Sequence, residues 1–129
     1  MIYHNLLLDT NIIIYYFNGL VSDQRIDDIL KKGFNISIIT KIEFLSWQQL
    51  YSDDLLREKA LAFISHATVY ELTDEIANAT IQIRQQYKIK TPDAIIAATA
   101  LVHGLDIATN NIDDFKYLDL DILSIEISQ

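Results

Sequence analysis

The sequence predicts one α/β domain, in which a five-stranded parallel sheet lies between layers of helices. Two observations lead to this fold class. Short apolar runs alternate with longer stretches whose apolar residues recur at helical spacing, a pattern typical of βαβ units and a parallel sheet. A chain of 129 residues with one Pro and three Gly has the length of a single domain and few places for long loops. We therefore expect residues 1–129 to form one domain.

The expected strands are short runs rich in apolar and β-branched residues. The first is apolar throughout, as a strand buried on both faces of a parallel sheet should be. The expected strands are Leu6–Leu8, Ile36–Ile39, Thr68–Leu72, Leu105–Ala108 and Ile122–Ile125.

The expected helices follow from apolar residues at helical spacing and from residues typical of helix ends. Gly19, Gly33 and Gly104 each follow such a stretch and predict where it stops. The expected helices are Asn11–Asn18, Asp23–Lys32, Thr40–Tyr51, Asp53–His66, Thr73–Tyr87 and Thr91–His103.

The composition limits the possible functions. Cysteine is absent, which excludes disulfides and thiolate metal sites. Residues 1–14 lack the basic start and small-residue cleavage site of a secretory signal, and the apolar runs are shorter than the roughly 18 residues of a membrane span. We therefore expect a cytoplasmic protein with no membrane partner. The net charge of −8 argues against tight, sequence-independent nucleic-acid binding and favours cations or a basic protein partner.

Asp9 is the first of several acidic residues expected at one edge of the sheet. It follows the strand Leu6–Leu8 directly, where ligands bind in open α/β folds. An Asp at this junction is also explained as a turn or cap residue. Thr10 and Asn11 can cap the following helix themselves, which leaves Asp9 available for another role.

Glu43 and Asp93 are expected at helix starts on the same edge. Thr40 and Glu43 match a capping box, and Thr91-Pro92-Asp93 matches a helix start with Thr as N-cap and Pro at the first helical position. These structural explanations suffice for each acid alone. The topology adds that both helices begin at the edge where Asp9 lies.

A polar segment, Thr109–Asp114, follows the expected fourth strand and supplies the fourth position. Thr109, Asn111 and Asp114 are the groups expected to point inward, and spacing alone does not choose between Asp113 and Asp114. Two unit charges about 4 Å apart repel by about 4 kcal/mol at an effective dielectric of ~20, so converging carboxylates favour a bound cation. Oxygen ligands without Cys or a nearby His favour Mg²⁺ or Mn²⁺, which commonly act on phosphates.

These motifs, in this order and in a chain of this length, resemble the PIN-domain family, and within it the VapC-type toxin ribonucleases of toxin–antitoxin pairs. The resemblance covers nearly the whole chain. The motifs are Leu7-Leu8-Asp9-Thr10-Asn11, Glu43, Thr91–Ala98, Thr109-Asn110-Asn111 and Asp114-Phe115.

The resemblance implies a fold, a site and a reaction. It implies a five-stranded parallel sheet, with Asp9 and Asp93 as metal ligands and Glu43 and Asp114 completing the catalytic acids. Asn111 competes with Asp114 for the fourth position, and Thr109 matches a hydroxyl residue that orients the site. The implied reaction is Mg²⁺-dependent hydrolysis of RNA phosphodiester bonds by metal-activated water, which leaves 3′-hydroxyl and 5′-phosphate ends. The implied partners are a cognate antitoxin and a second copy of the chain in a homodimer.

The net charge departs from what an RNA-binding protein would show, and other functions remain open. The candidate phosphate contacts are Arg84, Lys88 and Lys90, which also fit a solvated helix face. One alternative is a phosphatase or phosphotransfer domain, although no second Asp lies two residues beyond Asp9. The other is a catalytically silent acidic module that binds a basic protein partner.

Overall fold

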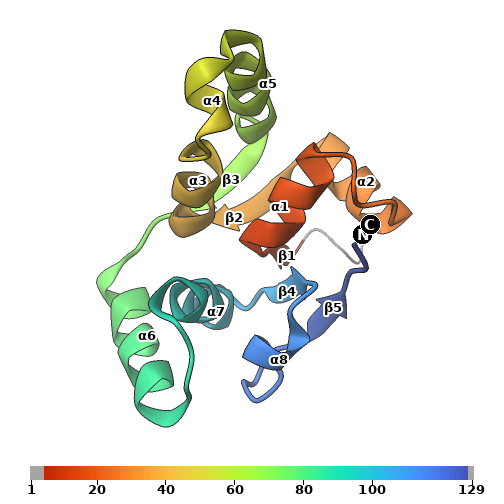
Figure 1. The fold of residues 1–129 in the computed structure, drawn as a ribbon. Helices are drawn as coiled ribbons and strands as arrows, with labels where there is room; N and C mark the ends of the chain where they lie inside the picture. The colour runs from red at the N-terminus through yellow and green to blue at the C-terminus, as the bar shows by residue number, and fades with distance from the viewer. Residues whose placement is uncertain (1–4, 128–129) are drawn as a thin grey trace.

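The structure, a computed structural model, describes residues 5–127, so the predicted domain of residues 1–129 extends beyond this range at both ends. The described residues form one sheet of five parallel strands in the order β3-β2-β1-β4-β5, which confirms the predicted fold class. Figure 1 shows this sheet with helices on both sides. The strands are β1 (Leu6–Leu8), β2 (Phe34–Ser37), β3 (Ala67–Tyr70), β4 (Asp106–Thr109) and β5 (Ile122–Ser124).

The strand order reverses beside β1, and this reversal determines where the candidate site lies. The chain builds β1, β2 and β3 outward in one direction and then returns to add β4 and β5 on the other side of β1. Such a reversal is a topological switch point, where the carboxyl ends of neighbouring strands open a crevice. Asp9 follows β1 and Thr109 ends β4, so both residues lie at this crevice.

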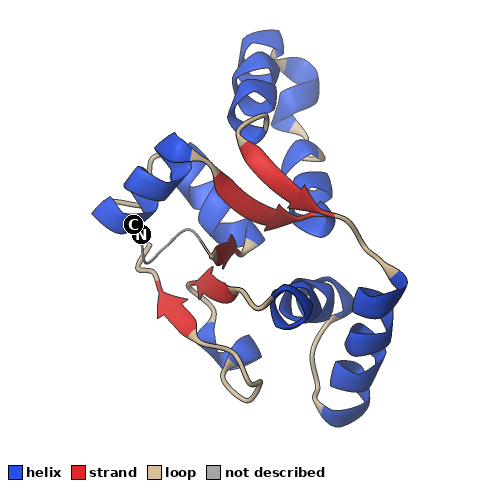
Figure 2. Cartoon of the chain, turned by 180° about the vertical axis from the view of Figure 1, so that it is seen from behind, coloured by secondary structure: helices blue, strands red, loops and turns tan. Residues whose placement is uncertain are grey.

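The alternation of β1 divides the core into two layers. Leu6 and Leu8 pack into one apolar cluster, and Leu7 packs into the other, because successive strand side chains point to opposite faces. The helices of both layers are visible from behind in Figure 2. They are α1 (Thr10–Phe17), α2 (Gln24–Lys32), α3 (Ile38–Leu45), α4 (Gln49–Ser52), α5 (Asp54–Ile64), α6 (Asp74–Gln86), α7 (Thr91–His103) and α8 (Ile112–Phe115).

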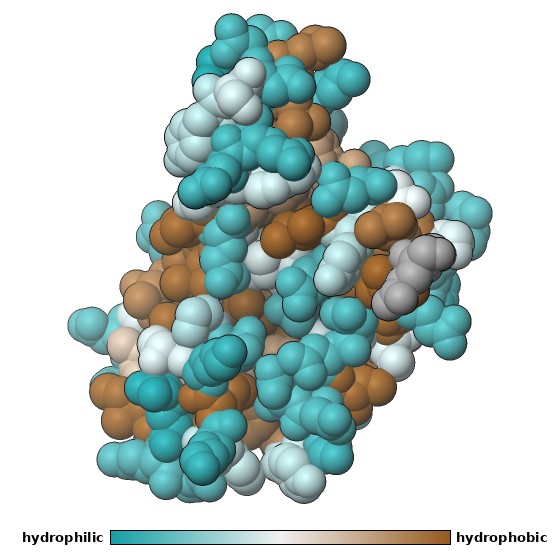
Figure 3. Space-filling view, viewed as in Figure 1, coloured by the Kyte–Doolittle hydropathy of each residue, from teal (hydrophilic) through white to brown (hydrophobic). Residues whose placement is uncertain are grey.

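Helix α7 carries the most buried sequence in the chain. Seven of its residues are buried, which matches its apolar composition, and it packs against α6 and the sheet. Gly104 ends it with a left-handed φ of 64°, a conformation that suits glycine. Figure 3 shows apolar residues among polar ones over α6 and α7. Apolar residues also lie below α4 and α5, which are at the top of this view. Among residues 5–127, no helix is long and apolar enough to cross a membrane.

The structure corrects the predicted boundaries around β2. The strand spans Phe34–Ser37 rather than Ile36–Ile39, and α3 begins at Ile38. Ser37 is the reason, because its Oγ accepts a hydrogen bond of 3.0 Å from the Ile39 N–H and caps the helix. The helix expected over 40–51 is two helices, α3 and α4, since α3 already ends at Leu45 with Ser46 as its C-cap. Helix α8 was not expected in the polar segment.

Candidate metal-binding active site

Asp9 is a buried carboxylate at the junction of β1 and α1. The residue is 4% exposed, and its Oδ1 accepts a 2.8 Å hydrogen bond from the Thr10 N–H. Its Oδ2 accepts a 2.7 Å hydrogen bond from the Thr109 hydroxyl, at the end of the neighbouring strand. The prediction that Thr10 and Asn11 cap this helix is wrong, because Asp9 itself is the N-cap residue. The junction therefore holds the carboxylate in one orientation.

The surroundings of Asp9 disfavour its charge. Burial raises its pKa above the usual value, the hydrogen bonds from Thr109 and Thr10 oppose this, and the charges of Glu43 and Asp114 raise the pKa further. A buried carboxylate is costly unless a cation or hydrogen bonds compensate for it.

Glu43 reaches the same crevice from α3. The Thr10 hydroxyl donates a 2.7 Å hydrogen bond to Glu43 Oε1 and lies 2.9 Å from the Thr40 hydroxyl. Because Thr10 gives its single hydroxyl hydrogen to Glu43, Thr40 must be the donor of the second bond. The predicted capping box is wrong, since Ser37 caps α3 and Glu43 lies in the second turn of the helix. The carboxylate of Glu43 is instead fixed by a tertiary contact with α1.

Asp93 is the third residue of α7 and is half-buried among the other acids. The predicted bounds of the helix, 91–103, are confirmed, but the predicted N-cap is wrong, because Lys90 is the N-cap residue and Thr91 and Pro92 are the first two helical residues. Burial raises the pKa of Asp93 to about 6, with further contributions from Asp9, Asp114 and Glu43. The four predicted acids therefore lie close enough to influence one another.

Asp114 completes the cluster, and the structure separates it from its neighbours. Asn111 Nδ2 donates a 2.6 Å hydrogen bond to Asp114 Oδ2, and the Asn111 N–H donates 2.9 Å to the Thr109 hydroxyl. Asp113 points away, since its side chain is 86% exposed and pairs with Lys116 at 3.0 Å. Helix α8 thus places Asp114 among the carboxylates, and Asn111 holds it there.

The donor set fits a hard divalent cation. Within residues 5–127, no Lys or Arg forms an ion pair with any of the four carboxylates. The same residues contain no group of three carboxylate or imidazole side chains already arranged as a metal cage. Mg²⁺ usually takes one or two carboxylates and keeps several waters, so an open arrangement of oxygen ligands suits it. Asp9 and Asp93, the two acids that the family resemblance assigns as ligands, both lie in this cluster and could hold it.

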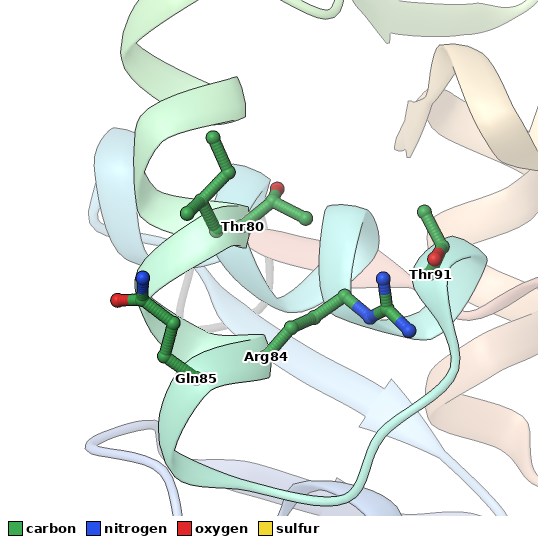
Figure 4. A pocket seen from close by; sticks show the side chains of 5 residues that line it. Thr80, Arg84, Gln85 and Thr91 are labelled. Carbon is green, nitrogen blue, oxygen red and sulfur yellow. The ribbon is translucent and has the colours of Figure 1, made fainter.

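Three basic residues lie in the last turn of α6 and in the segment that joins it to α7. Arg84 Nε donates a 3.3 Å hydrogen bond to the Ile89 carbonyl, and the guanidinium extends towards Thr91 at the start of α7, as Figure 4 shows. The pocket between these residues, which Thr80 and Gln85 also line, has a volume of about 410 Å³. Lys88 and Lys90 are exposed, and in the described part of the chain neither forms an ion pair. The predicted phosphate contacts therefore lie near the helix that carries Asp93.

Two hydroxyl residues belong to the site although the sequence pattern suggested only capping roles. Thr10 and Thr40 connect Glu43 to α1, and both are buried. Thr109, by contrast, was expected to orient the site and does contact Asp9. The position of Thr10, directly after an acidic residue at a strand end, is the sequence feature that could have predicted its role in the site.

Comparisons with known proteins agree with this fold. The family model described as "PIN domain" matches residues 6–120. Ribonuclease VapC1 of Rickettsia felis is 32% identical over 130 residues, covering 93% of this chain and 96% of the relative. These two matches show that the chain belongs to the PIN-domain family, among its VapC-type members.

Several solved structures are also similar to this chain. A toxin–antitoxin complex from Klebsiella pneumoniae contains a chain 31% identical to this one, with a TM-score of 0.72 over 92% of this chain and 96% of that chain. FitAcB from Neisseria gonorrhoeae is 25% identical, with a TM-score of 0.77 over the same shares. VapBC2 from Rickettsia felis, solved with a DNA fragment from its promoter, has the same fold at 20% identity, with a TM-score of 0.76 over 94% of this chain and 98% of that chain.

Proposed function

We propose that this protein is a Mg²⁺-dependent endoribonuclease and the toxin of a toxin–antitoxin pair. The observation that carries the proposal is the cluster of Asp9, Glu43, Asp93 and Asp114 at the switch point, since the described residues provide no ion pair for any of them. The family adds the substrate class, because a relative of similar length is named a ribonuclease.

The residues of the chain have distinct roles in this proposal. Asp9 and Asp93 would hold Mg²⁺, which when bound would supply a Lewis acid for the phosphate and lower the pKa of a water molecule. Thr109 and the Thr10 N–H keep both oxygens of Asp9 oriented, and Asn111 holds one oxygen of Asp114, Oδ2. Thr10 holds Glu43 within reach of the same crevice. Arg84, Lys88 and Lys90 offer positive charge to the RNA backbone where the rest of the surface repels it.

The proposed partners follow from the neighbours of known structure. The Klebsiella pneumoniae structure is a toxin–antitoxin complex, and a DNA-bound VapBC from Salmonella typhimurium is 27% identical to this chain with a TM-score of 0.73. We propose that a cognate antitoxin binds this chain and that the toxin itself is a homodimer. A basic antitoxin segment would complement the net charge of −8.

Cleavage of total RNA tests the proposed reaction. The wild-type protein should cut RNA with Mg²⁺ or Mn²⁺ and stop when EDTA is added, with 5′-phosphate ends at the mapped sites. Asp9→Asn and Asp93→Asn should each lower the rate by about 100-fold or more, because each removes a charged ligand.

Asp54→Asn is the matched control for these variants. Asp54 lies on α5, is exposed and pairs with Arg57 at 3.0 Å, so its substitution should leave the rate unchanged. Full activity in folded Asp9→Asn and Asp93→Asn would contradict the proposal. A stable aspartyl-phosphate after incubation with acetyl phosphate would instead favour the phosphotransfer function, and Mg²⁺-independent binding of a basic protein without cleavage would favour the silent module.

A further inference from the structure

A cleft beside Asp114 is not explained by the carboxylate cluster. It has a volume of about 260 Å³ and lies between the segment that follows α6 and the segment of α8. Tyr87 and Lys88 line it from the first segment, and Asp113, Asp114 and Tyr117 line it from the second. We propose that this cleft binds one unpaired base of the RNA substrate, an inference that rests on the proposed ribonuclease function.

The two tyrosines give the cleft the character of a stacking site. Tyr117 is 69% exposed and Tyr87 is 38% exposed, so neither ring is used to fill the core. Exposed aromatic rings are the surfaces on which proteins stack unpaired RNA bases. The Lys116 ammonium lies over one face of Tyr117, 5.1 Å from the ring centroid, which leaves the opposite face for a base.

Of the charged residues that line the cleft, Lys88 is the one that can attract a phosphate, and Asp113 and Asp114 are the two acids beside it. Lys88 is exposed, and among residues 5–127 it takes part in no ion pair, so it can meet the phosphate attached to the base. The charge of Asp113 is already balanced by Lys116 at 3.0 Å. A polyanion approaching a protein of net charge −8 needs such a local cation.

The position of the cleft identifies which nucleotide it holds. Asp114 lines the cleft and also belongs to the carboxylate cluster, so a base in the cleft lies beside the scissile phosphodiester. A base in a continuous helix is stacked on its neighbours and cannot enter such a cleft. The inferred substrate therefore presents an unpaired nucleotide next to the cut, in a loop or a single strand.

Substitution of Tyr117 tests the subsite. RNA affinity is measured by fluorescence anisotropy in the inactive Asp93→Asn background, with a labelled single-stranded oligoribonucleotide that contains a mapped cleavage site. Tyr117→Leu should weaken binding by roughly tenfold, as loss of one stacked base does, whereas Tyr117→Phe should bind like the parent because the ring remains. Tyr51→Leu is the matched control, since Tyr51 is 68% exposed on α4 and does not line the cleft.

Abasic nucleotides locate the base that is recognised. Removing one base next to the cut should weaken binding to the parent protein by roughly tenfold, and the same removal should have little further effect in Tyr117→Leu. Unchanged RNA affinity in Tyr117→Leu, with normal cleavage by the wild type, would overturn the subsite and leave the ribonuclease function standing.

Two other outcomes would also overturn the subsite. If Tyr117→Leu keeps the full abasic effect but changes the oligomeric state in light scattering, the cleft is an interface between protein chains. If the wild type neither binds nor cuts RNA with Mg²⁺, the proposed function fails, and the subsite fails with it.

Discussion

Asp93 is a single residue of the candidate site that lowers the stability of the folded protein at neutral pH. Its folded pKa of about 6 lies above the ordinary value of 3.8, so the folded state holds the proton more tightly than the unfolded state. Without metal, the folded protein therefore loses stability as the pH rises through this window. The negative charge that would bind a cation is the charge whose burial costs the folded protein stability.

Asp93→Asn should stabilise the metal-free protein near neutral pH. Asn lacks the charge that is costly above pH 6, so we expect a gain of roughly 1–2 kcal/mol at about pH 7.5 after allowance for solvent screening, and little gain at about pH 4.5. Thermal unfolding in EDTA at the two pH values measures the difference. Asp113→Asn, at an exposed position, should show no such pH dependence, and a gain for Asp93→Asn that is equal at both pH values would contradict the explanation.

At the scale of elements, the site depends on where α3 begins. Ser37 ends β2 and caps α3, and this one-residue transition places Thr40 and Glu43 on the face that meets Thr10. A helix that began at Thr40, as the capping pattern suggested, would change how Glu43 is held.

Ser37→Ala should lower both stability and activity. Loss of the cap costs about 1 kcal/mol, and the loosened first turn of α3 should displace Glu43 and reduce the cleavage rate. Asp53→Ala is the comparison, because Asp53 caps α5 through a 3.0 Å bond from the Leu56 N–H and contacts none of the four acids. It should lose similar stability in urea unfolding but keep its cleavage rate. Equal rates in both variants would show that the start of α3 does not control Glu43.

The sequence predicts much of the fold and the members of the acid cluster, but not how they are held. Short runs of apolar and β-branched residues reveal all five strands and the parallel sheet, although only β1 is buried throughout and the edge strands β3 and β5 are partly exposed. The run Ile36–Ile39 misleads, since four apolar or small residues suit a strand and a helix start equally. The Thr10–Glu43 hydrogen bond joins residues that only the folded chain brings together. Likewise, the orientation of the single-turn helix α8 decides between Asp113 and Asp114.

For the whole molecule, the balance of charge predicts a protein stabilised by its cation. Four carboxylates repel one another at the switch point, on a chain with a net charge of −8. A ligand that binds only the folded state stabilises it by about 2.7 kcal/mol at 100 times its Kd. Folding and binding of the proposed cation would therefore be thermodynamically linked.

Mg²⁺ should raise the melting temperature of the wild-type protein by several degrees at saturating concentration, and this shift should be largely lost in Asp93→Asn. Differential scanning calorimetry across a Mg²⁺ titration gives the shift, and Asp113→Asn should keep it. Equal stabilisation of the wild type and Asp93→Asn would mean that the ion binds elsewhere on the acidic surface.

The return of the chain to the far side of β1 has a consequence for synthesis. A nascent chain that has grown only to the end of α7 already contains Asp9, Glu43 and Asp93. It still lacks β4, whose Ala108 carbonyl accepts the Asp9 N–H at 3.0 Å and whose Thr109 orients the Asp9 carboxylate. It also lacks α8 and therefore Asp114. A partly translated polypeptide of this kind lacks residues of the proposed catalytic centre, so on this proposal a ribosome would carry an inactive chain until the last two strands emerge and pack against β1.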